Sequence, residues 1–379
     1  MVTPGFHPIK GGTETMVRSL SVELDKIGVR TDVMTFNMDR KWDPKWKGKT
    51  EKTDGITVFK VPALNWLPIA HSRRITMGIN LIPGRFTQIL KQYDILHFHE
   101  DLTFPFFSIF VRKPKIFHLH GTLPAKAHGT GKIERTIFKH IAHLYISLSR
   151  QGQKTLSTLG IPKNKITYLP NGVDTDLFSP QEKKEDNLLL FVGRIAPDKG
   201  LHVLLKSLLY LKKSIRLVII GPAGWNLYYQ DMLNLIESEN QKKKHEIRYL
   251  GALEQADIIK WYQKASIFIL PSFAEGLPVV ILEALSCKTP VVATSVGAVP
   301  EVVQNRENGI LVPLNNPLKL AEAIQYLLDN KDIRIKFGKI GRELVIKSFS
   351  LEIVVKQLCS IYETMVSHSA LANLAKENA

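Results

Sequence analysis

The sequence has few cysteines and no long hydrophobic run. Among its 379 residues only Cys287 and Cys359 are cysteines, and each lies in a helical pattern. This argues against a disulfide framework or a cysteine metal site and favours a reducing compartment. No apolar stretch is long enough to span a bilayer, and the first residues show no basic region followed by an apolar one. We therefore expect a cytoplasmic protein that is neither secreted nor integral to a membrane.

Several motifs of nucleotide and hydrolase chemistry are also missing. No Gly-x-Gly-x-x-Gly follows a strand pattern, which argues against a dehydrogenase, and no Gly-x-Ser-x-Gly element supports a hydrolase. Residues 127–133 resemble the end of a phosphate-binding P-loop but lack its earlier glycine and the following Ser or Thr. No Asp-x-Asp stands at a strand end, so nothing suggests a divalent ion for phosphates.

Basic residues are in excess, and the excess lies in the first half. The net charge is +16; residues 1–175 hold 26 Lys and Arg against 13 Asp and Glu, whereas residues 176–379 hold 25 against 22. We expect the first half to meet something anionic, such as lipid headgroups or an acidic or phosphorylated acceptor. Nucleic acid is the weakest of these options, because no helix-turn-helix, zinc-finger or aromatic strand motif accompanies the charge.

Short β-rich runs alternate with amphipathic helical patterns throughout the chain. This alternation is typical of parallel sheets covered by helices on both faces. The length suits two or three domains, and we expect an α/β protein with two Rossmann-like, doubly wound domains. Strands are predicted near residues 30–36, 56–60, 95–98, 116–120, 144–147 and 166–169, and then near 188–192, 216–220, 247–250, 267–270, 291–293 and 310–312.

Turn-forming residues between 169 and 180 mark the predicted linker between the domains. We place a first domain at residues 1–172, a second at 173–350, and a C-terminal helix and tail at 351–379. The helical pattern of the last segment covers about 351–366, follows a break at 348–350, and is expected to pack back on the first domain. Residues 367–379 are expected to fray.

The first strand of the first domain looks truncated. The helix opened by Gly11 and Gly12 should follow a central strand, but only residues 1–3 can supply it. A missing central strand would leave buried backbone groups without partners, at a cost of several kcal/mol or more. We therefore hypothesise that the native start lies about five residues upstream.

Glu275 and Glu283 stand eight residues apart, where a hydrophobic strand gives way to a turn and a helix. If the helix begins near Leu277, its free N–H groups and its dipole can hold a phosphate without a metal. Two carboxylates at this spacing could accept hydrogen bonds from hydroxyl groups at the two ends of a sugar nucleotide. Taken alone, the pair is more simply two solvated glutamates on a surface helix.

Glycines and fixed cations follow two other predicted strand ends. Gly11 and Gly12 open the first helix and would let backbone amides approach a phosphate, although a glycine pair is usually only a turn. Arg194 and Lys199 follow the first strand of the second domain, where doubly wound sheets bind ligands. Two cations there could neutralise a diphosphate, and the alternative is a loop with ordinary surface charges.

Four histidines form two His-x-His pairs, His97 with His99 and His118 with His120, on predicted neighbouring strands. Alternation puts each pair on one face of the sheet, so a metal site is one reading. We prefer the other reading, in which His97 and His118 are buried and hydrogen-bonded in place while His99 and His120 end their strands at the ligand crevice. His120 is the one that we assign to a substrate.

Taken together, these residues resemble the retaining glycosyltransferases of family 4, which have the GT-B architecture of two Rossmann-like domains facing across a cleft. The similarity covers nearly the whole chain, and its Glu-x7-Glu element is highly specific. The matching positions are Gly11 to Glu14, Tyr93 to His99, His120 to Thr122, Pro170 to Asp174 with Phe178, Gly193 and Arg194 with Lys199 and Gly200, Pro271 and Ser272 with Glu275 and Glu283, and Pro290 to Ala293 with Gly297, Pro300 and Glu301.

The resemblance implies roles for single residues. Glu275 corresponds to the carboxylate beside the transferred sugar, Glu283 to the one that holds the nucleotide ribose, and His120 to the residue near the sugar's outer hydroxyls. Arg194 and Lys199 correspond to the diphosphate-binding pair. The donor-binding set that we expect is completed by Gly11, Gly12, Leu250, Gly251, Leu277 and Val279.

One position departs from the family pattern, since many members have glycine where Pro278 stands. Because proline has no N–H, any contact made by that amide must shift to Leu277 or Val279.

The resemblance predicts a metal-independent transferase without a cofactor, moving a hexosyl unit from a UDP- or GDP-sugar to a glycan, glycolipid or other acceptor with retention of anomeric configuration. Two alternatives stay open: a sugar-nucleotide epimerase of the same architecture, which needs no acceptor, and a basic nucleic-acid-binding module. Aromatic-rich segments at 64–68 and 104–110 suggest contact with an anionic membrane surface, although such segments are more often buried core. The nucleotide base, the sugar and the acceptor are not readable from the sequence.

Overall fold

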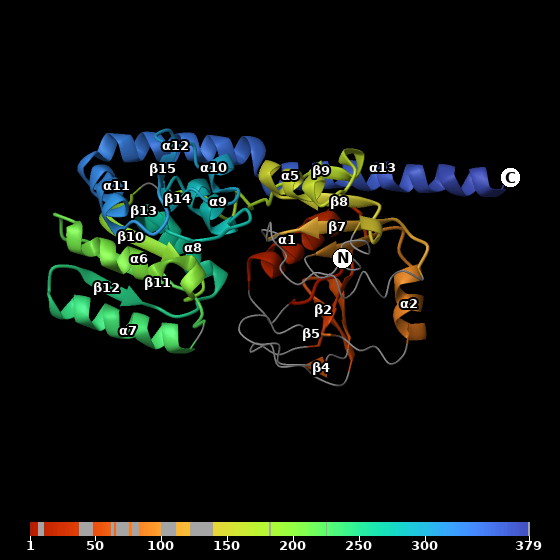
Figure 1. Ribbon diagram of the computed structural model, residues 1–379, viewed down its shortest axis with the longest axis horizontal. Coiled ribbons are helices and arrows are strands. Elements are labelled where there is room, and N and C mark those ends of the chain that lie inside the picture. Colours follow the sequence, from red (N-terminus) through yellow and green to blue (C-terminus); the bar gives the residue numbers. More distant parts are fainter. Residues whose placement is uncertain are drawn as a thin grey trace. The chain divides into compact units, whose positions relative to one another are not determined.

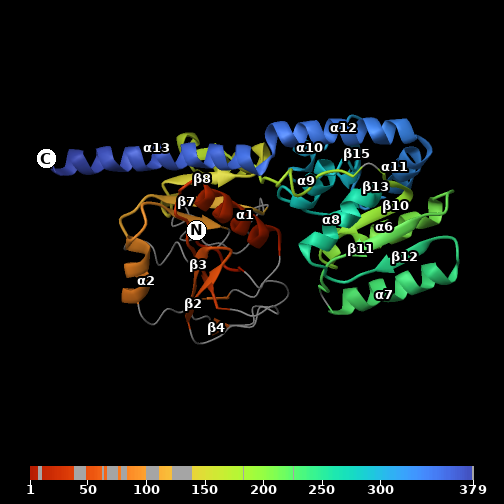
Figure 2. The same cartoon turned by 180° about the vertical axis from the view of Figure 1, so that it is seen from behind.

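The computed structural model describes residues 1–6, 11–37, 48–61, 64–65, 76–77, 83–99, 111–121, 139–181, 183–224 and 226–377. The chain divides into two compact units: unit 1 comprises Met1–Pro170 and Val354–Ala379, and unit 2 comprises Asn171–Ile353. Figures 1 and 2 show the elements of both units from opposite sides. The P-loop-like segment at 127–133 and the aromatic segments at 66–68 and 104–110 lie outside the described residues.

Unit 1 contains a mainly parallel sheet in two parts. One part has the order β1-β3-β2 and the other the order β6-β7-β8-β9, and only the β2–β3 pair is antiparallel. A short antiparallel pair, β4 with β5, stands apart. The strands are β1 (Val33–Phe36), β2 (Lys49–Thr53), β3 (Ile56–Val61), β4 (Leu64–Asn65), β5 (Thr76–Met77), β6 (Leu96–His99), β7 (Lys115–Leu119), β8 (Leu144–Ser147) and β9 (Ile166–Tyr168).

Val2 joins the two parts of this sheet. It bridges Met34 of β1 on one side and Phe98 of β6 on the other, both in the parallel sense. Its N–H donates to the carbonyl of His97 at 2.7 Å, and its own carbonyl accepts from the N–H of His99 at 2.8 Å. Residues 1–3 therefore occupy the place of the central strand, as expected from the sequence, and pair with both neighbours over that length.

The helices of unit 1 follow the strands in α/β fashion. They are α1 (Gly12–Lys26), α2 (Pro83–Lys91), α5 (Arg150–Thr158), the short 3₁₀ turn η2 (Lys163–Lys165), and the part of α13 (Leu351–Glu377) that belongs to this unit. Burial of Met16, Val17, Leu20 and Leu24 on one side of α1 reflects its amphipathic spacing. Ser149 caps α5 by accepting from the N–H of Gly152.

Unit 2 has a six-stranded, all-parallel sheet in the order β12-β11-β10-β13-β14-β15. Numbered from its first strand, this order is 3-2-1-4-5-6, the arrangement of a Rossmann domain. The strands are apolar and buried over most of their length, as expected for a sheet covered on both faces. They are β10 (Glu185–Val192), β11 (Arg216–Ile220), β12 (Glu246–Tyr249), β13 (Ala265–Leu270), β14 (Val291–Thr294) and β15 (Gly309–Val312).

Two groups of helices cover this sheet: α6 contacts α7 and α11, while α9 contacts α8 and α12. Figure 1 shows α7 beside β12, the strand that follows it. The helical elements of unit 2 are η3 (Pro197–Lys199), α6 (Leu201–Ser207), η4 (Leu208–Tyr210), α7 (Asn226–Gln241), α8 (Gln255–Lys264), α9 (Val279–Ser286), α10 (Val299–Val302), α11 (Pro317–Asp329) and α12 (Lys331–Ser348). Among the described residues, no helix is both long and apolar enough to cross a membrane.

All twelve strands predicted from the sequence are present, with ends shifted by at most three residues. Two predictions about helices are wrong. The last helix does not end near residue 366, because α13 continues to Glu377 through a stretch rich in Ala, Leu, Lys and Glu, which favour helix. The helix after β13 begins at Val279 and not near Leu277, because Pro278 stands at its N-cap with extended backbone.

Candidate functional site

Three of the predicted site residues gather at the switch point of the unit 2 sheet. β10 lies between β11 and β13, so the chain leaves β10 in one direction along the sheet and later returns to its other side. Doubly wound sheets bind ligands at the carboxyl ends of the strands that flank such a point. Arg194 and Lys199 lie in the loop after β10, and Glu275 lies in the loop after β13.

Lys199 and Glu275 form an ion pair across these two loops. The Nζ atom of Lys199 lies 2.8 Å from Oε1 of Glu275, and the side chains are 22% and 8% exposed. Arg194 is 54% exposed, and it pairs with Asp198 at 3.4 Å. A guanidinium that stays open to solvent can turn toward an incoming anion, whereas the lysine is already held by a carboxylate.

Backbone contacts fix the positions of these loops. The N–H of Phe273 donates to the carbonyl of Asp198 at 2.8 Å, and the N–H of Ala298 donates to the carbonyl of Gly276 at 2.9 Å. The side-chain amide of Asn171 donates to the carbonyl of Leu277 at 2.7 Å. Each of these bonds joins the Glu275 loop to another segment of unit 2, so the carboxylate is held on a rigid backbone.

Two glycines permit this close packing. Gly200 has φ +69°, and a Cβ there would overlap the carbonyl of Pro271. Gly297 has φ +54°, and a Cβ there would overlap the carbonyl of Glu275 itself. Both positions require the left-handed conformation that glycine adopts without penalty. At both, another backbone segment packs directly against the Glu275 loop.

Helix α9 directs its N-terminus into the same region of unit 2. Its eight residues begin at Val279, so Glu275 lies in the preceding turn and only the last part of the path to Glu283 is helical. The interval between the two carboxylates is therefore a turn followed by about one helical turn, and not one continuous helix. Because Pro278 has no N–H, the amide of Val279 is the first of the helix that can face a ligand. Leu277 is buried beside it.

Glu283 lies within α9 and accepts a hydrogen bond from a tyrosine of the neighbouring helix α8. The hydroxyl of Tyr262 on α8 donates to Oε2 of Glu283 at 2.7 Å. Burial raises the pKa of Glu283 from its usual 4.5 to about 7, although the Tyr262 hydrogen bond works in the opposite direction. The carboxyl group therefore changes charge near neutral pH.

Leu250 and Gly251 follow β12 at the same edge of the sheet. The N–H of Leu250 donates to the carbonyl of Ile219, and the carbonyl of Gly251 accepts from the N–H of Gly221 at 2.8 Å. Gly251 has φ +70°, and the space beside its Cα is open. These residues thus line the carboxyl edge through backbone groups, while Leu250 itself is only half-buried.

The remaining predicted residues lie in unit 1. Gly11 is the N-cap of α1 with extended backbone, Gly12 is its first residue, and both are exposed with open space beside Gly12. His120 stands one residue beyond β7 and is buried. Its Nε2 atom lies 2.8 Å from Nδ1 of His99, so the side chain that we assign to a substrate is supported by a second histidine.

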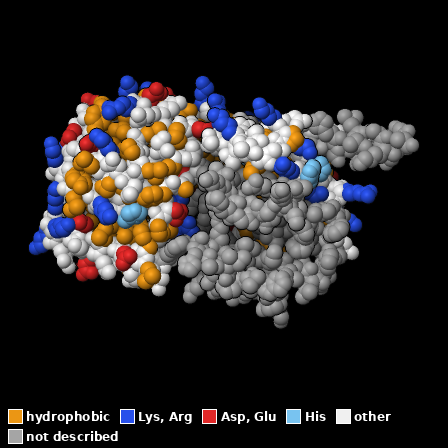
Figure 3. Space-filling view, in the orientation of Figure 1, with side chains coloured by type: hydrophobic (Ala, Val, Ile, Leu, Met, Phe, Trp, Pro, Cys, Tyr) orange, Lys and Arg blue, Asp and Glu red, His pale blue; other side chains and the backbone are white. Residues whose placement is uncertain are grey.

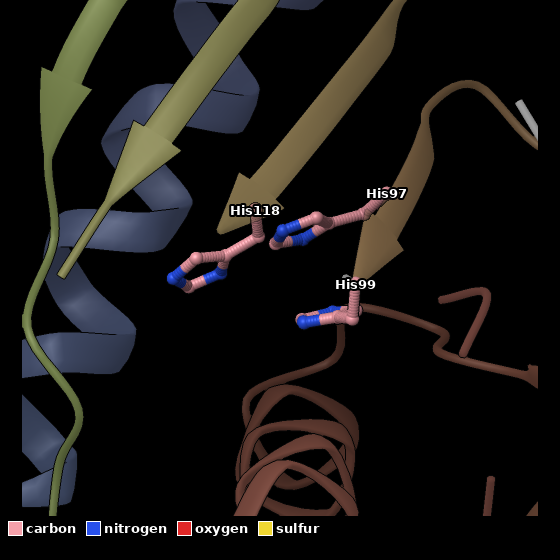
Figure 4. Close-up of side chains that lie close together, drawn as sticks. All are labelled: His97, His99 and His118. Carbon is pink, nitrogen blue, oxygen red and sulfur yellow. The ribbon is translucent and has the colours of Figure 1, made fainter. Parts of the chain in front are cut away.

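The four histidines lie together on one face of this sheet, as alternation predicts. Figure 4 shows His97 and His99 projecting from one strand and His118 from its neighbour. Their rings stack, with centroids 4.2 Å apart for His97 and His99 and 5.3 Å apart for His97 and His118. The expectation that His118 is hydrogen-bonded in place is wrong: neither of its ring nitrogens has a partner among the described residues.

Residues that support the site were missed at the sequence level. Three hydrogen bonds join residues that are far apart in the sequence. Tyr262 bonds to Glu283 across 21 residues, Tyr362 to His97 across 265, and Asn171 to Leu277 across 106. The run Pro170 to Asp174 belongs to the predicted linker and to the family pattern, but neither predicts the contact of Asn171 with Leu277. No periodic pattern marks such partners, because packing between distant elements creates them.

Two family descriptions match adjacent stretches of the chain. Residues 10–177 match "Glycosyltransferase Family 4", and residues 173–344 match "Glycosyl transferases group 1". Together they indicate a GT-B glycosyltransferase of group 1 and family 4. The shared stretch at 173–177 falls just after the boundary between units 1 and 2.

Individual relatives agree with this assignment. The D-inositol 3-phosphate glycosyltransferase of Corynebacterium glutamicum (strain R) is 24% identical, over 94% of this chain and 93% of that protein. The sucrose-phosphate synthase of Thermosynechococcus elongatus superposes with a TM-score of 0.77 at 21% identity, covering 97% of this chain and 99% of that one. Anabaena HepE in complex with UDP-glucose gives a TM-score of 0.76 at 17% identity, covering 96% and 99%. The structural likenesses show the GT-B fold.

Gly297 provides a test of how tightly the Glu275 loop is packed. We expect Gly297→Ala to destabilise unit 2 by more than about 3 kcal/mol, because the left-handed conformation costs about 1–2 kcal/mol and the collision with the Glu275 backbone adds to it. Gly251→Ala is the matched control, since it has a similar φ but open space, and it should cost only the conformational part. Urea unfolding of both variants gives the comparison, and equal losses would show that the Glu275 loop can yield.

Proposed function

We propose that this glycosyltransferase moves a hexosyl unit from a nucleotide-diphosphate sugar to an acceptor hydroxyl, with retention of anomeric configuration. The observation that carries the proposal is the Lys199–Glu275 pair at 2.8 Å at the switch point of a Rossmann sheet, beside the N-terminus of α9. In this pair, a cation suited to a diphosphate lies beside a carboxylate suited to sugar hydroxyls. A nucleotide-sugar donor is supported by two similar structures, HepE in complex with UDP-glucose and a starch synthase bound to ADP.

Each residue has a role in this proposal. Lys199 and Arg194 bind the diphosphate, and Glu275 accepts hydrogen bonds from hydroxyl groups of the transferred sugar. Glu283 binds the ribose, while Leu250 and Gly251 border the base through backbone groups. The amide of Val279, two residues after Leu277, faces the phosphates from the start of α9.

Unit 1 supplies the other proposed contacts. The exposed amides at Gly11 and Gly12, at the N-terminus of α1, are suited to phosphate oxygens. His120 contacts the outer hydroxyls of the sugar, and its contact with His99 at 2.8 Å orients the ring for this task.

The chemistry consists of one bond broken and one formed at the anomeric carbon. The bond from this carbon to the diphosphate oxygen breaks, and negative charge grows on the leaving group. Fixed cations and a helix N-terminus stabilise that charge with little reorganisation. The acceptor's oxygen forms the new bond on the face that the diphosphate leaves, and its proton passes to the departing phosphate oxygen.

The first experiment identifies the donor and the stereochemistry. A donor that binds the folded protein raises its apparent stability, so thermal-shift screening with UDP-, GDP- and ADP-sugars should single out one of them. The purified product is then examined by NMR for the configuration at the anomeric carbon. We expect the configuration of the donor to be kept; an inverted product would reject retention, and no shift with any donor would reject the nucleotide-sugar site.

Lys199 should matter more for turnover than for binding. We expect Lys199→Met to lower kcat by about 10²–10³-fold, because the charge that it stabilises develops only as the bond breaks. Donor affinity should fall much less. Lys206→Met, which removes an exposed lysine from the helix after the same loop, should leave kcat unchanged. Steady-state kinetics with calorimetric donor binding separate the two effects, and a Lys199 variant that lost only affinity would contradict the role.

Glu283 should give donor binding a pH dependence. Its carboxyl has a pKa of about 7, and the ionised form accepts the stronger, charge-assisted hydrogen bonds from hydroxyl groups. Affinity for a nucleotide sugar should therefore rise about tenfold between pH 6 and pH 8, as the ionised fraction rises. The diphosphate of a nucleotide sugar is esterified at both ends and does not titrate in this range.

The matched variant is Glu283→Gln, which cannot ionise. Calorimetric titrations with it should show weak binding that varies little with pH, and an unchanged pH profile would contradict the ribose role. A raised pKa in the folded state also means that ionisation of Glu283 lowers stability as the pH rises from 4.5 through 7. Binding is therefore measured well below the unfolding temperature at each pH.

The acceptor that we propose is a glycan or a glycolipid, and an anionic one fits the basic excess in residues 1–175. On the face in Figure 3, Lys and Arg side chains are spread over the described surface of unit 2 among acidic and apolar ones. Sedimentation with anionic vesicles at low and high salt tests a membrane-bound acceptor, since salt-sensitive pelleting is expected of an electrostatic surface contact and its absence would remove the membrane from the proposal.

A further inference from the structure

Three buried histidines of unit 1 have ring nitrogens that the transfer mechanism does not use. The Nε2 atoms of His97 and His99 and both ring nitrogens of His118 are buried and lack hydrogen-bond partners among the described residues. A neutral imidazole carries one N–H donor and one acceptor, so at least one unpaired donor is buried on His118. Each such group costs about 1–3 kcal/mol when it stays unpaired. Four of them in one place indicate a missing ligand.

We propose that His97, His99 and His118 bind a divalent transition metal ion of the zinc class. The candidate ligand atoms of the three residues all lie within 4.8 Å of one another. Tetrahedral coordination at about 2.0–2.1 Å needs nitrogens about 3.4 Å apart, so modest rotation of the rings suffices. Figure 4 shows the three rings projecting to the same side of the sheet.

The strand geometry explains why these side chains meet. His97 and His99 are two residues apart on β6 and therefore face the same side of the sheet. His118 on β7 is directly opposite His99 in the parallel register. A ligand set on two adjacent strands is rigid, because the backbone hydrogen bonds of the sheet fix its spacing.

The hydrogen bonds at the other ring nitrogens match those of metal-binding histidines. The Nδ1 atom of His97 lies 2.7 Å from the hydroxyl of Tyr362 on α13, and Nδ1 of His99 lies 2.8 Å from Nε2 of His120. In metal sites the nitrogen that does not bind the ion is usually held in this way, which sets the ring orientation and the tautomer. In both residues the Nε2 atom is the one left for the ion.

The chemistry of the ligands selects the ion. Coordination requires neutral imidazole, which offers one ring-nitrogen lone pair to the ion. Neutral imidazole suits zinc, copper, nickel and cobalt, whereas magnesium and calcium prefer oxygen. Three protein ligands leave a fourth position for water or another small ligand.

An ion here would also affect His120. By holding His99, it would fix the ring that contacts His120 at 2.8 Å. This consequence depends on the proposed role of His120 in sugar binding, but the metal site itself does not. The ion would thus position a side chain and would take no part at the diphosphate, whose partners are Lys199 and Arg194.

The test uses the full chain without a histidine tag. The protein is stripped with a chelator, titrated separately with zinc, cobalt and magnesium, passed through a desalting column, and analysed for metal by mass spectrometry. We expect one zinc or cobalt ion per chain and no magnesium. Bound cobalt should give the strong visible absorption of four-coordinate geometry. Less than half an equivalent of zinc, or a cobalt spectrum of the six-coordinate hydrated type, would overturn the proposal.

Variants locate the ion. His118→Gln should weaken zinc binding at least 100-fold, and Tyr362→Phe, which keeps all three ligands, should weaken it about 10–100-fold. His245→Gln is the control and should leave zinc affinity unchanged. His245 is a buried histidine of unit 2, and its ring makes one hydrogen bond, to the carbonyl of Leu208. Unchanged zinc affinity in both His118→Gln and Tyr362→Phe would place the ion elsewhere and reject the site. If His118→Gln does not fold, Tyr362→Phe alone decides.

Discussion

The ion pair between Lys199 and Glu275 joins the two loops on which the rest of the site depends. The carboxylate is 8% exposed, so it would be costly to bury without the lysine beside it. In the absence of donor each group neutralises the other. In the proposed function, a nucleotide-diphosphate sugar offers each of them a better partner, since it brings anionic oxygens for the lysine and hydroxyl donors for the carboxylate. In the proposed function, the pair therefore holds both side chains in place until the donor binds.

The position of this pair follows from the order of the strands in unit 2. Because β10 and β13 are neighbours while the chain between them passes through β11 and β12, the loops at their carboxyl ends lie side by side at the switch point, where doubly wound sheets bind ligands. The backbone around the Glu275 loop is closely packed, with Gly297 against the carbonyl of Glu275 and the Asn171 amide on the carbonyl of Leu277. Such packing supports catalysis through charges that are fixed before the reaction begins.

Much of this arrangement was predictable from the sequence, and the failures have physical reasons. The strands and the loops that carry Arg194, Lys199 and Glu275 could be predicted, because alternation and turn residues are local signals. The predicted start of α9 was two residues too early. The apolar pattern suggested Leu277, but Pro278 holds the backbone extended and the helix begins at Val279. The partners Tyr262 and Tyr362 could not be predicted, because their contacts depend on how distant helices pack.

The histidine pairs show the same limit of sequence-based prediction. Their alternation on β6 and β7 was readable, yet the sequence favoured hydrogen-bonded histidines over a metal site. Only the structure shows which nitrogens are paired and which are not. Unpaired buried polar groups are rare in folded proteins, so they carry more information about function than the motif itself.

The central claim is that Lys199 exchanges Glu275 for the diphosphate of a nucleotide sugar. A crystal structure of the chain with its donor tests this directly. We predict that the Nζ atom of Lys199 will lie within hydrogen-bond distance of a diphosphate oxygen, with the Glu275 carboxylate on a sugar hydroxyl. A structure in which the diphosphate binds away from the β10 and β13 loops, with the Lys199–Glu275 pair undisturbed, would contradict the account.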